Sequence, residues 1–318
     1  MSEEKRVATR DSYGQVLLEL ARVHDNIIAM DADLADSTRS GSIRKEFPER
    51  FFDCGIAEAN MVSVAAGMAT TGMVPFISSF AMFAAGRAYE QIRNSIGYPK
   101  MNVKIVASHA GISVGEDGAT HQCLEDIALM RTIPGMVVMC PSDDVETKAA
   151  VRAAYEYDGP VYIRTGRLAV PVFHEAEDFS FEIGKGEVVE DGSDVTIVAT
   201  GLLVKEARDA ARILKDKGIS CRVINICTIK PIDTEILVKA ARETGAIVTA
   251  EEHNVVGGLG EAVAAALAEN YPCLLKRVGV NDEFGTSGPA LDLLKLYGLS
   301  AEHLVEVCEE ICAKKNNR

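Results

Sequence analysis

Residues 103–122 read VKIVASHAGISVGEDGATHQ, and the organisation of the N-terminal half follows from them. The run Val103–Ser108 is short, apolar and rich in β-branched residues, which is typical of a buried strand. A loop with three glycines, two histidines and an acid between them follows directly. In a parallel sheet such a loop lies at the carboxyl edge of the strands, where ligands bind. His109, Asp117 and His121 are therefore candidate functional residues.

Beyond this stretch, short apolar runs alternate with amphipathic segments along the chain. Strands that alternate with helices predict an α/β fold of mainly parallel sheets covered by helices on both faces. The alternation is interrupted between Val170 and Asp194, where proline, glycine and charged residues gather. A length of 318 residues favours two domains. We expect a first domain over residues 1–175, a linker over 176–193 and a second domain over 194–318.

The composition excludes several classes of partner. Lys and Arg number 33 against 47 Asp and Glu, which gives a net charge of −14. Such a chain repels phosphate backbones and anionic lipid, so neither nucleic acid nor a membrane is an expected partner. We see no secretory signal, and the eight cysteines are scattered without a C-x-x-C pair, which indicates reduced thiols and a cytoplasmic protein. An anionic substrate would need local cations.

Two further segments carry candidate site residues. Residues 52–61 read FDCGIAEANM, and Glu58 opens a helix made almost wholly of small and apolar residues, which predicts burial. An acid at this position could also simply complement the helix dipole. In residues 79–83, SFAMF, the spacing of Phe80 and Phe83 is equally typical of ordinary core packing. A zinc site at His109 and His121 is not favoured, because no third ligand accompanies them.

The motifs G-I-x-E-x-x-M, F-x-x-F and a histidine followed by G-E-D-G-x-T-H-Q occur in this order. Together they resemble the pyrimidine-binding domain of transketolases. The chain from Asp194 onward, with Glu251-Glu252-His253 before a glycine loop, resembles the C-terminal domain of the same family. The resemblance implies the two transketolase domains and a transferase that uses thiamine diphosphate to move a two-carbon ketol group from a ketose phosphate to an aldose phosphate.

The resemblance also implies roles around the cofactor. Glu58 matches the carboxyl group that hydrogen-bonds the pyrimidine ring and activates the cofactor. Phe83 matches the aromatic residue that stacks on this ring, and Phe80 lines the same pocket. Asp33 matches a residue near the cofactor. Many family members have a tyrosine three residues after the stacking phenylalanine, where this chain has Gly86 followed by Arg87, so Arg87 could contribute to the pocket instead.

Substrate-binding positions are implied as well. Arg10, Ser37, His109 and Arg167 match residues that hold the sugar phosphate, which would supply the local cations that an acidic chain needs. Asp117 matches a residue that contacts a substrate hydroxyl. His121 and His109 match residues that contact the sugar and take part in catalysis, with His121 assisting proton transfer.

Full-length transketolases carry a G-D-G motif that binds Mg²⁺ and the diphosphate, and this chain contains no G-D-G. We therefore expect no metal site in the chain itself. The resemblance then implies a split enzyme of the pentose phosphate pathway. A partner subunit, equivalent to the N-terminal half, would supply the Mg²⁺ and diphosphate site in an α2β2 heterotetramer.

Three alternatives stay open at this point. The chain could be the C-terminal half of a deoxyxylulose-phosphate synthase, although that family has a shorter first loop and an arginine in place of His109. It could be the β subunit of a 2-oxoacid dehydrogenase E1, which shares G-I-x-E but lacks the G-E-D-G-x-T-H-Q run. A non-catalytic protein of the same fold is a third possibility, against which the retained Glu58, His109, Asp117 and His121 argue.

Overall fold

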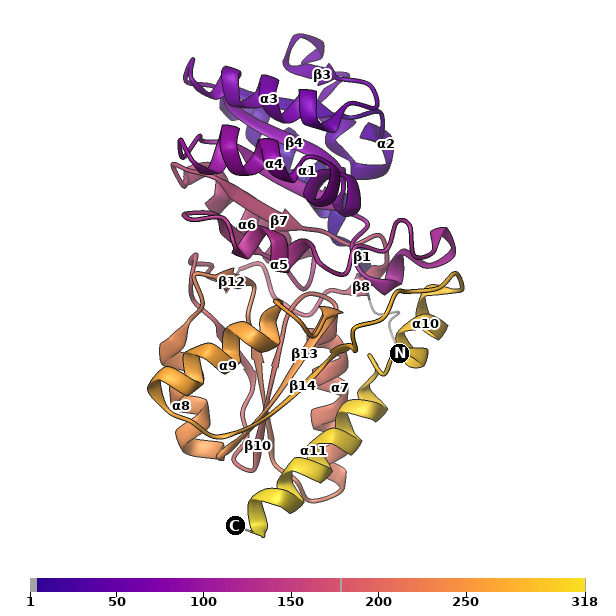
Figure 1. Ribbon diagram of the computed structural model, residues 1–318, viewed down its shortest axis with the longest axis vertical. Helices are drawn as coiled ribbons and strands as arrows, with labels where there is room; N and C mark the ends of the chain where they lie inside the picture. Colours follow the sequence, from indigo (N-terminus) through magenta and orange to yellow (C-terminus); the bar gives the residue numbers. More distant parts are fainter. Residues whose placement is uncertain (1–4, 178, 318) are drawn as a thin grey trace.

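The computed structural model describes residues 5–177 and 179–317, which form two α/β units, one above the other in Figure 1. Residues 1–4 of the expected first domain, residue 178 of the expected linker and residue 318 of the expected second domain lie outside the described residues. The upper unit in Figure 1 comes mainly from the N-terminal half and the lower unit from the C-terminal half. The predicted α/β fold of mainly parallel sheets flanked by helices is confirmed.

Within the described residues, the first sheet has seven strands in the order β12-β6-β7-β5-β4-β2-β3. Their bounds are β2 (Ile27–Asp31), β3 (Phe51–Asp53), β4 (Val74–Phe80), β5 (Lys104–Ser108), β6 (Val137–Met139), β7 (Val161–Arg164) and β12 (Thr228–Lys230). All neighbours pair in parallel except β12 and β6, which are antiparallel. The carboxyl ends of β5, β4, β2 and β3 therefore lie next to one another along one edge.

Helices cover both faces of this sheet. On one face α1 (Thr9–Val23) and α6 (Asp144–Glu156) pack with the strands in one hydrophobic cluster. On the other face lie α3 (Glu58–Ala69) and α5 (Asp126–Arg131). The short elements of this unit are α2 (Ala35–Thr38), η1 (Ser40–Ile43), η2 (Pro48–Arg50), the π-helical η3 (Met82–Arg87), α4 (Tyr89–Gln91), the π-helical η4 (Ile92–Gly97) and η5 (Ile112–Asp117).

The start of α6 shows how local sequence sets an element. Asp143 is the N-cap residue, and its carboxylate accepts a hydrogen bond from the Glu146 backbone N–H at 2.9 Å. Glu146 in turn accepts from the backbone N–H of Ser142 at 2.6 Å. The N–H of Glu146 in the first turn and the N–H of Ser142 just before the N-cap are thus both satisfied by side chains, so the helix begins where the Ser-Asp cluster predicts it.

The second sheet has five strands within the described residues, in the order β14-β13-β10-β11-β9. They are β9 (Glu187–Glu190), β10 (Val195–Ala199), β11 (Cys221–Asn225), β13 (Ala246–Asn254) and β14 (Leu274–Val280). One face packs against α7 (Leu203–Asp216), α10 (Ala290–Leu296) and α11 (Ala301–Asn316), and the other against α8 (Thr234–Thr244) and α9 (Leu259–Asn270). β9 lies within the expected linker and pairs with β11, so part of that segment belongs to the second sheet.

The two units share structure across their junction. β12 comes from the C-terminal half of the sequence, yet it pairs with β6, with Thr228 opposite Met139. One hydrophobic cluster contains buried residues of both units, from Met61 of α3 to Leu267 of α9. In a two-stranded sheet, β1 (Arg6–Ala8) pairs with β8 (Ala169–Pro171), which joins the beginning and the end of the first unit. The second unit therefore supports the first directly.

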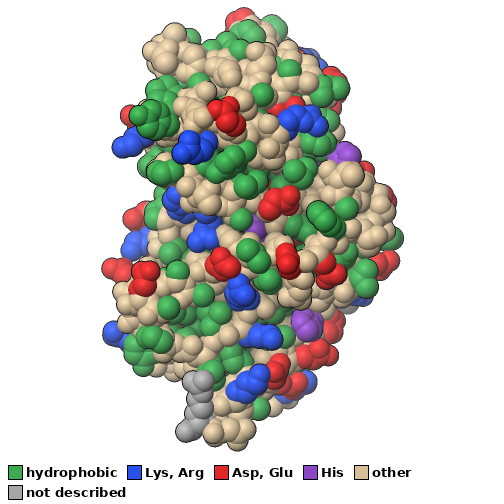
Figure 2. Space-filling view, in the orientation of Figure 1, with side chains coloured by type: hydrophobic (Ala, Val, Ile, Leu, Met, Phe, Trp, Pro, Cys, Tyr) green, Lys and Arg blue, Asp and Glu red, His purple; other side chains and the backbone are tan. Residues whose placement is uncertain are grey.

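The surface carries charges of both signs. On the face in Figure 2, basic and acidic side chains are interspersed, and hydrophobic atoms lie between them in small areas. Among the described residues, no helix combines the length and the apolar composition that crossing a membrane would require.

Candidate active site

The candidate residues gather where the first sheet places the ends of its central strands. Phe80 is the last residue of β4, and His109 directly follows β5. Asp33 comes two residues after β2, and Glu58 begins α3 after β3. Because these four strands are neighbours and run in parallel, their carboxyl ends bring the four residues to one edge.

Glu58 lies buried at the first turn of α3. Its side chain is 1% exposed, and both of its carboxylate oxygens accept hydrogen bonds from Nη1 of Arg87 at 2.9 Å. The rest of α3 carries no charged residue, so the helix packs against the sheet. Its single acid, Glu58, is buried together with the helix. The Arg87 side chain is 52% exposed and therefore reaches from solvent to a buried carboxylate.

Four rings form the wall next to this pair. Phe80 stacks on His109 with 3.9 Å between ring centroids and on Phe83 with 5.9 Å. His121 meets Phe83 edge-on at 5.4 Å. The Arg87 guanidinium lies 4.7 Å from the centroid of Phe83, a cation–π contact. Residues that are up to 41 positions apart in the sequence, Phe80 and His121, thus line one aromatic site.

A cationic cluster adjoins the rings. Nη1 of Arg10 lies 3.1 Å from Nε2 of His109 and donates to the backbone carbonyl of Ser37 at 2.9 Å. Nδ1 of His109 is 2.8 Å from Oγ of Ser108. Burial, followed by the nearby charges of Arg10 and Arg167, lowers the pKa of His109 to about 3. The imidazole is therefore neutral near pH 7, and the positive charge of the cluster belongs to the arginines.

Ser37 enters this cluster through its backbone carbonyl oxygen. Arg167 contacts the loop that carries Asp117. Its Nη1 donates to the carbonyl of Val114 at 2.7 Å and lies 3.8 Å from Oδ2 of Asp117. Arg167 and Asp117 are each 39% exposed and so remain accessible.

Asp33 occupies a separate position on the same edge. Its backbone is in the left-handed region, with φ of +62°, and its N–H donates to Oδ1 of Asp53 at 3.1 Å. The side chain of Asp33 is exposed. The structure therefore brings Phe80 and Phe83 together, links Glu58 to Phe83 through Arg87, and places Asp33 apart from them on the same edge.

Comparison with known proteins identifies the chain. Residues 5–172 match the family "Transketolase, pyrimidine binding domain", and residues 184–304 match "Transketolase, C-terminal domain". The chain belongs to the transketolase family.

Individual relatives agree with this assignment. The chain is 52% identical to a "Putative transketolase C-terminal section" from Methanocaldococcus jannaschii, over 95% of this chain and 96% of that protein. It is 44% identical to a "6-deoxy-6-sulfo-D-fructose transketolase subunit" from a Clostridium species, over 97% of this chain and 96% of that one. A solved structure, "Split gene transketolase, inactive beta4 tetramer", superposes with a TM-score of 0.89 at 50% identity and covers 97% of this chain and 99% of that chain. The predicted resemblance to the C-terminal half of a split transketolase is thus confirmed.

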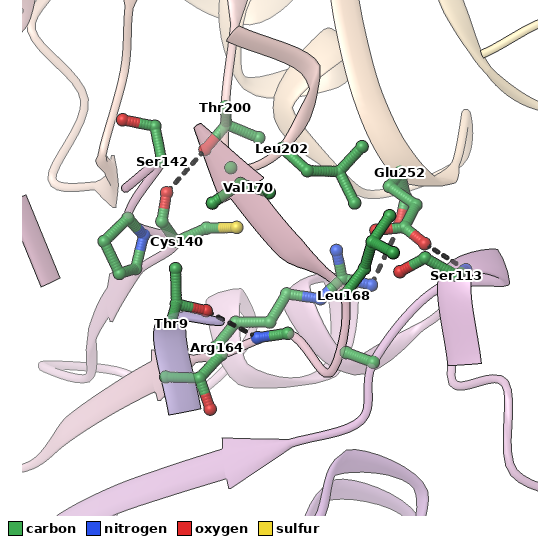
Figure 3. Close-up of a pocket in the computed structure, with 15 residues that line it drawn as sticks. Thr9, Ser113, Cys140, Ser142, Arg164, Leu168, Val170, Thr200, Leu202 and Glu252 are labelled. Atoms are coloured by element: carbon green, nitrogen blue, oxygen red, sulfur yellow. Dashed lines mark hydrogen bonds between the residues drawn. The ribbon is translucent and has the colours of Figure 1, made fainter. Parts of the chain in front are cut away.

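In this transketolase-family chain, residues of the second domain contact the loop that leads to Asp117 and support it. Arg164, at the end of β7, donates through Nε to Asp126 at 3.0 Å and through Nη2 to the carbonyl of Glu252 at 2.8 Å. The Glu252 carboxylate accepts a hydrogen bond from the backbone N–H of Ser113, in the loop that leads to Asp117 (Figure 3). Burial raises the pKa of Glu252 to about 7. The C-terminal domain thereby fixes the position of the loop.

Asp31 is a buried acid on the same sheet edge that was not among the predicted site residues. It is fully buried at the end of β2 and accepts hydrogen bonds from the N–H of Leu34 and the hydroxyls of Thr38 and Ser40, at 2.6–2.8 Å. These bonds hold the turn that carries Ser37. An acid that ends a wholly apolar strand run and precedes a Ser-Thr-rich turn is the sequence signal for such a residue.

An open pocket adjoins the aromatic wall. It has a volume of about 750 Å³ and lies between the π-helical η3 and the loop after β14. Its lining includes Met82, Phe83, Arg87, Asp282, Glu283 and Phe284. The candidate site is therefore reached from the surface between the two domains.

Proposed function

We propose that this chain is the subunit of a split thiamine-diphosphate transketolase that activates the pyrimidine ring of the cofactor and binds the sugar phosphates. The observation that carries the proposal is Glu58, a buried carboxylate paired with Arg87, whose guanidinium lies over the face of Phe83. A buried acid and an aromatic face are the two groups that an aminopyrimidine ring requires of a protein.

The residues of the site fit this cofactor. When bound, thiamine diphosphate would supply an acidic thiazolium carbon and an electron sink for the two-carbon fragment. Glu58, whose side chain is 1% exposed, would share a proton with the pyrimidine ring nitrogen. Phe83 would stack on the ring, and Phe80, which is 92% buried, would fix the orientation of Phe83.

The cationic cluster would hold the substrate. Arg10 and Arg167 offer guanidinium groups to a phosphate, and the neutral His109 can donate or accept a hydrogen bond at the sugar. Asp117, whose side chain is 39% exposed, would accept a hydrogen bond from a substrate hydroxyl. The ring of His121 lies edge-on to that of Phe83. His121 would assist proton transfer to and from the oxygens of the sugar.

A second subunit completes the proposal. The chain has no G-D-G motif, so the Mg²⁺ and the diphosphate would be bound by a partner that carries it. We infer a cytoplasmic α2β2 heterotetramer that acts in the pentose phosphate pathway. The donor sugar is a separate question, because one relative is named for a sulfonated fructose.

The experiment that tests this function is a reconstitution. The chain is mixed with a G-D-G partner subunit, thiamine diphosphate and Mg²⁺, and ketol transfer from xylulose 5-phosphate to ribose 5-phosphate is followed, with each subunit alone as a control. We expect transfer in the mixture only. Release of carbon dioxide from pyruvate without ketol transfer would instead support a deoxyxylulose-phosphate synthase or a 2-oxoacid dehydrogenase.

A further inference from the structure

Arg39 has an unusual backbone that another helix makes possible. It follows α2 with φ of +69° and ψ of 7°, a left-handed conformation that is unfavourable for an arginine. Gly14 of α1 lies directly against it, and a Cβ on Gly14 would come within 2.6 Å of the Arg39 Cβ. The absence of a side chain at residue 14 therefore gives room for Arg39 to turn back toward the site.

This turn places the Arg39 guanidinium beside that of Arg10. Nη1 of Arg39 donates to the carbonyl of Asp36 at 2.9 Å, and Nη1 of Arg10 donates to the next carbonyl, that of Ser37, at 2.9 Å. The two guanidinium groups thus donate hydrogen bonds to the backbone carbonyls of two consecutive residues. Nε of Arg39 also donates to Oδ1 of Asp11 at 2.6 Å, and Asp11 is the neighbour of Arg10 in α1.

The two arginines retain donors for a further acceptor. Within residues 5–177 and 179–317, the buried Nε of Arg10 has no hydrogen-bond partner. The Arg39 side chain is 45% exposed, and its hydrogen bonds to other described residues use only Nε and Nη1. After burial, the charge of Arg39 is the largest contribution that lowers the pKa of Arg10, which agrees with two like charges held close together.

We propose that Arg39 is a further anion-binding residue, which with Arg10 holds the phosphate group of the sugar substrate. This inference rests on the proposed function. A phosphate between two planar guanidinium groups can accept several parallel hydrogen bonds, and it removes the repulsion between the two cations. Asp11 offsets one of these charges and competes with the phosphate for Nε of Arg39.

The test uses Arg39→Gln and Arg39→Lys in the reconstituted enzyme. Glutamine meets the same backbone cost as arginine at φ of +69°, so the variant isolates the loss of charge. The matched control is Arg22→Gln, because Arg22 also pairs with a carboxylate, Glu46, from an exposed position on α1. It lies about 18 Å along the helix from Arg10.

For Arg39→Gln we expect KM for a phosphorylated aldose acceptor to rise about five- to tenfold, with kcat within about twofold of the wild-type value. KM for the uncharged acceptor glycolaldehyde should stay unchanged. Arg39→Lys should recover part of the loss, because it keeps the charge but not the planar fork. An equal change for charged and uncharged acceptors, or an equal change in Arg22→Gln, would overturn the proposal.

Binding of inorganic phosphate to the full chain, measured by isothermal titration calorimetry, gives a readout that does not depend on catalysis. Arg39→Gln should weaken this binding, Asp11→Asn should strengthen it, and Arg22→Gln should leave it as in the wild type. Absence of ketol transfer together with this pattern would refute the proposed transketolase function and retain the anion site. Wild-type phosphate binding in Arg39→Gln, or no phosphate binding by the wild-type chain, would overturn the role of Arg39.

Discussion

Arg87 donates from one nitrogen, Nη1, to both carboxylate oxygens of Glu58 at 2.9 Å. The contact depends on the π-helical segment Met82–Arg87, because a wider turn carries Arg87 over the face of Phe83. Arg87 thereby supplies the positive charge for a carboxylate that is otherwise buried. The pair joins the acid of the proposed catalytic site to its aromatic wall.

The Glu58–Arg87 pair should be measurable as stability. Arg87→Met leaves a buried carboxylate without its cation, and we expect the free energy of unfolding to fall by about 1–2 kcal/mol. This is less than for a fully buried pair, because Arg87 is half-exposed. Urea denaturation of the full chain measures the change. Glu58→Gln in the Arg87→Met background should lose less than the two single changes add up to, and strict additivity would show that the contact contributes nothing.

Arg164 should contribute more to the free energy of unfolding than Arg87, because both Arg164 and Asp126 are buried at the domain junction. Arg164→Met leaves the buried Asp126 carboxylate with the Tyr162 hydroxyl but without its cation, so we expect a loss of about 3–5 kcal/mol in the free energy of unfolding. Arg212→Met removes an exposed arginine of α7 and is the control. A loss for Arg164→Met no larger than that of the control would contradict the supporting role assigned to this residue.

The lowered pKa of His109 predicts that the folded chain loses stability at acidic pH. Its pKa of about 3 in the folded chain lies below the value of about 6.5 expected when unfolded, so the unfolded state binds more protons between these pH values. The contribution is present above pH ~6.5 and is lost as the pH falls toward 3. His109→Gln should therefore lose less stability than the wild type between pH 7 and pH 4.5. Parallel pH profiles for the two proteins would count against a buried neutral imidazole.

The raised pKa of His174 predicts that the folded chain loses stability at alkaline pH. Burial opposes its protonation, but hydrogen bonds with Asp143 and Glu187 raise the pKa of His174 to about 9. Its contribution is complete below pH ~6.5 and is lost as the pH rises through about 9. Thermal unfolding between pH 6.5 and 9.5 should thus show a smaller alkaline decrease for His174→Gln than for the wild type. A decrease of the same size in both proteins would exclude this ion pair as its source.

The sequence was sufficient for those parts of the site that follow strands. The apolar run Val103–Ser108 predicts His109 at the sheet edge, and the acid that opens an apolar helix predicts that Glu58 is buried, both from local patterns alone. The contact between Glu58 and Arg87 could not be deduced in this way. The position of Arg87 depends on a π-helical turn that no local sequence pattern predicts.

Contacts between distant segments were also beyond the sequence. The hydrogen bond between Ser113 and Glu252 joins residues 139 positions apart, and it depends on how the two domains pack. The same holds for β12, whose pairing with β6 brings C-terminal residues into the first sheet. Arg39 escaped notice because its orientation comes from a left-handed backbone and from the space left by Gly14.

The central claim is that Glu58 activates the cofactor, and the exchange of the thiazolium C2 proton of thiamine diphosphate tests it most directly. The exchange is followed by NMR in D2O for the reconstituted wild type, for Glu58→Gln and for Glu310→Gln, an exposed control on α11. We predict that Glu58→Gln slows the exchange by at least about 100-fold and that the control leaves it unchanged. Wild-type exchange in Glu58→Gln would contradict the account.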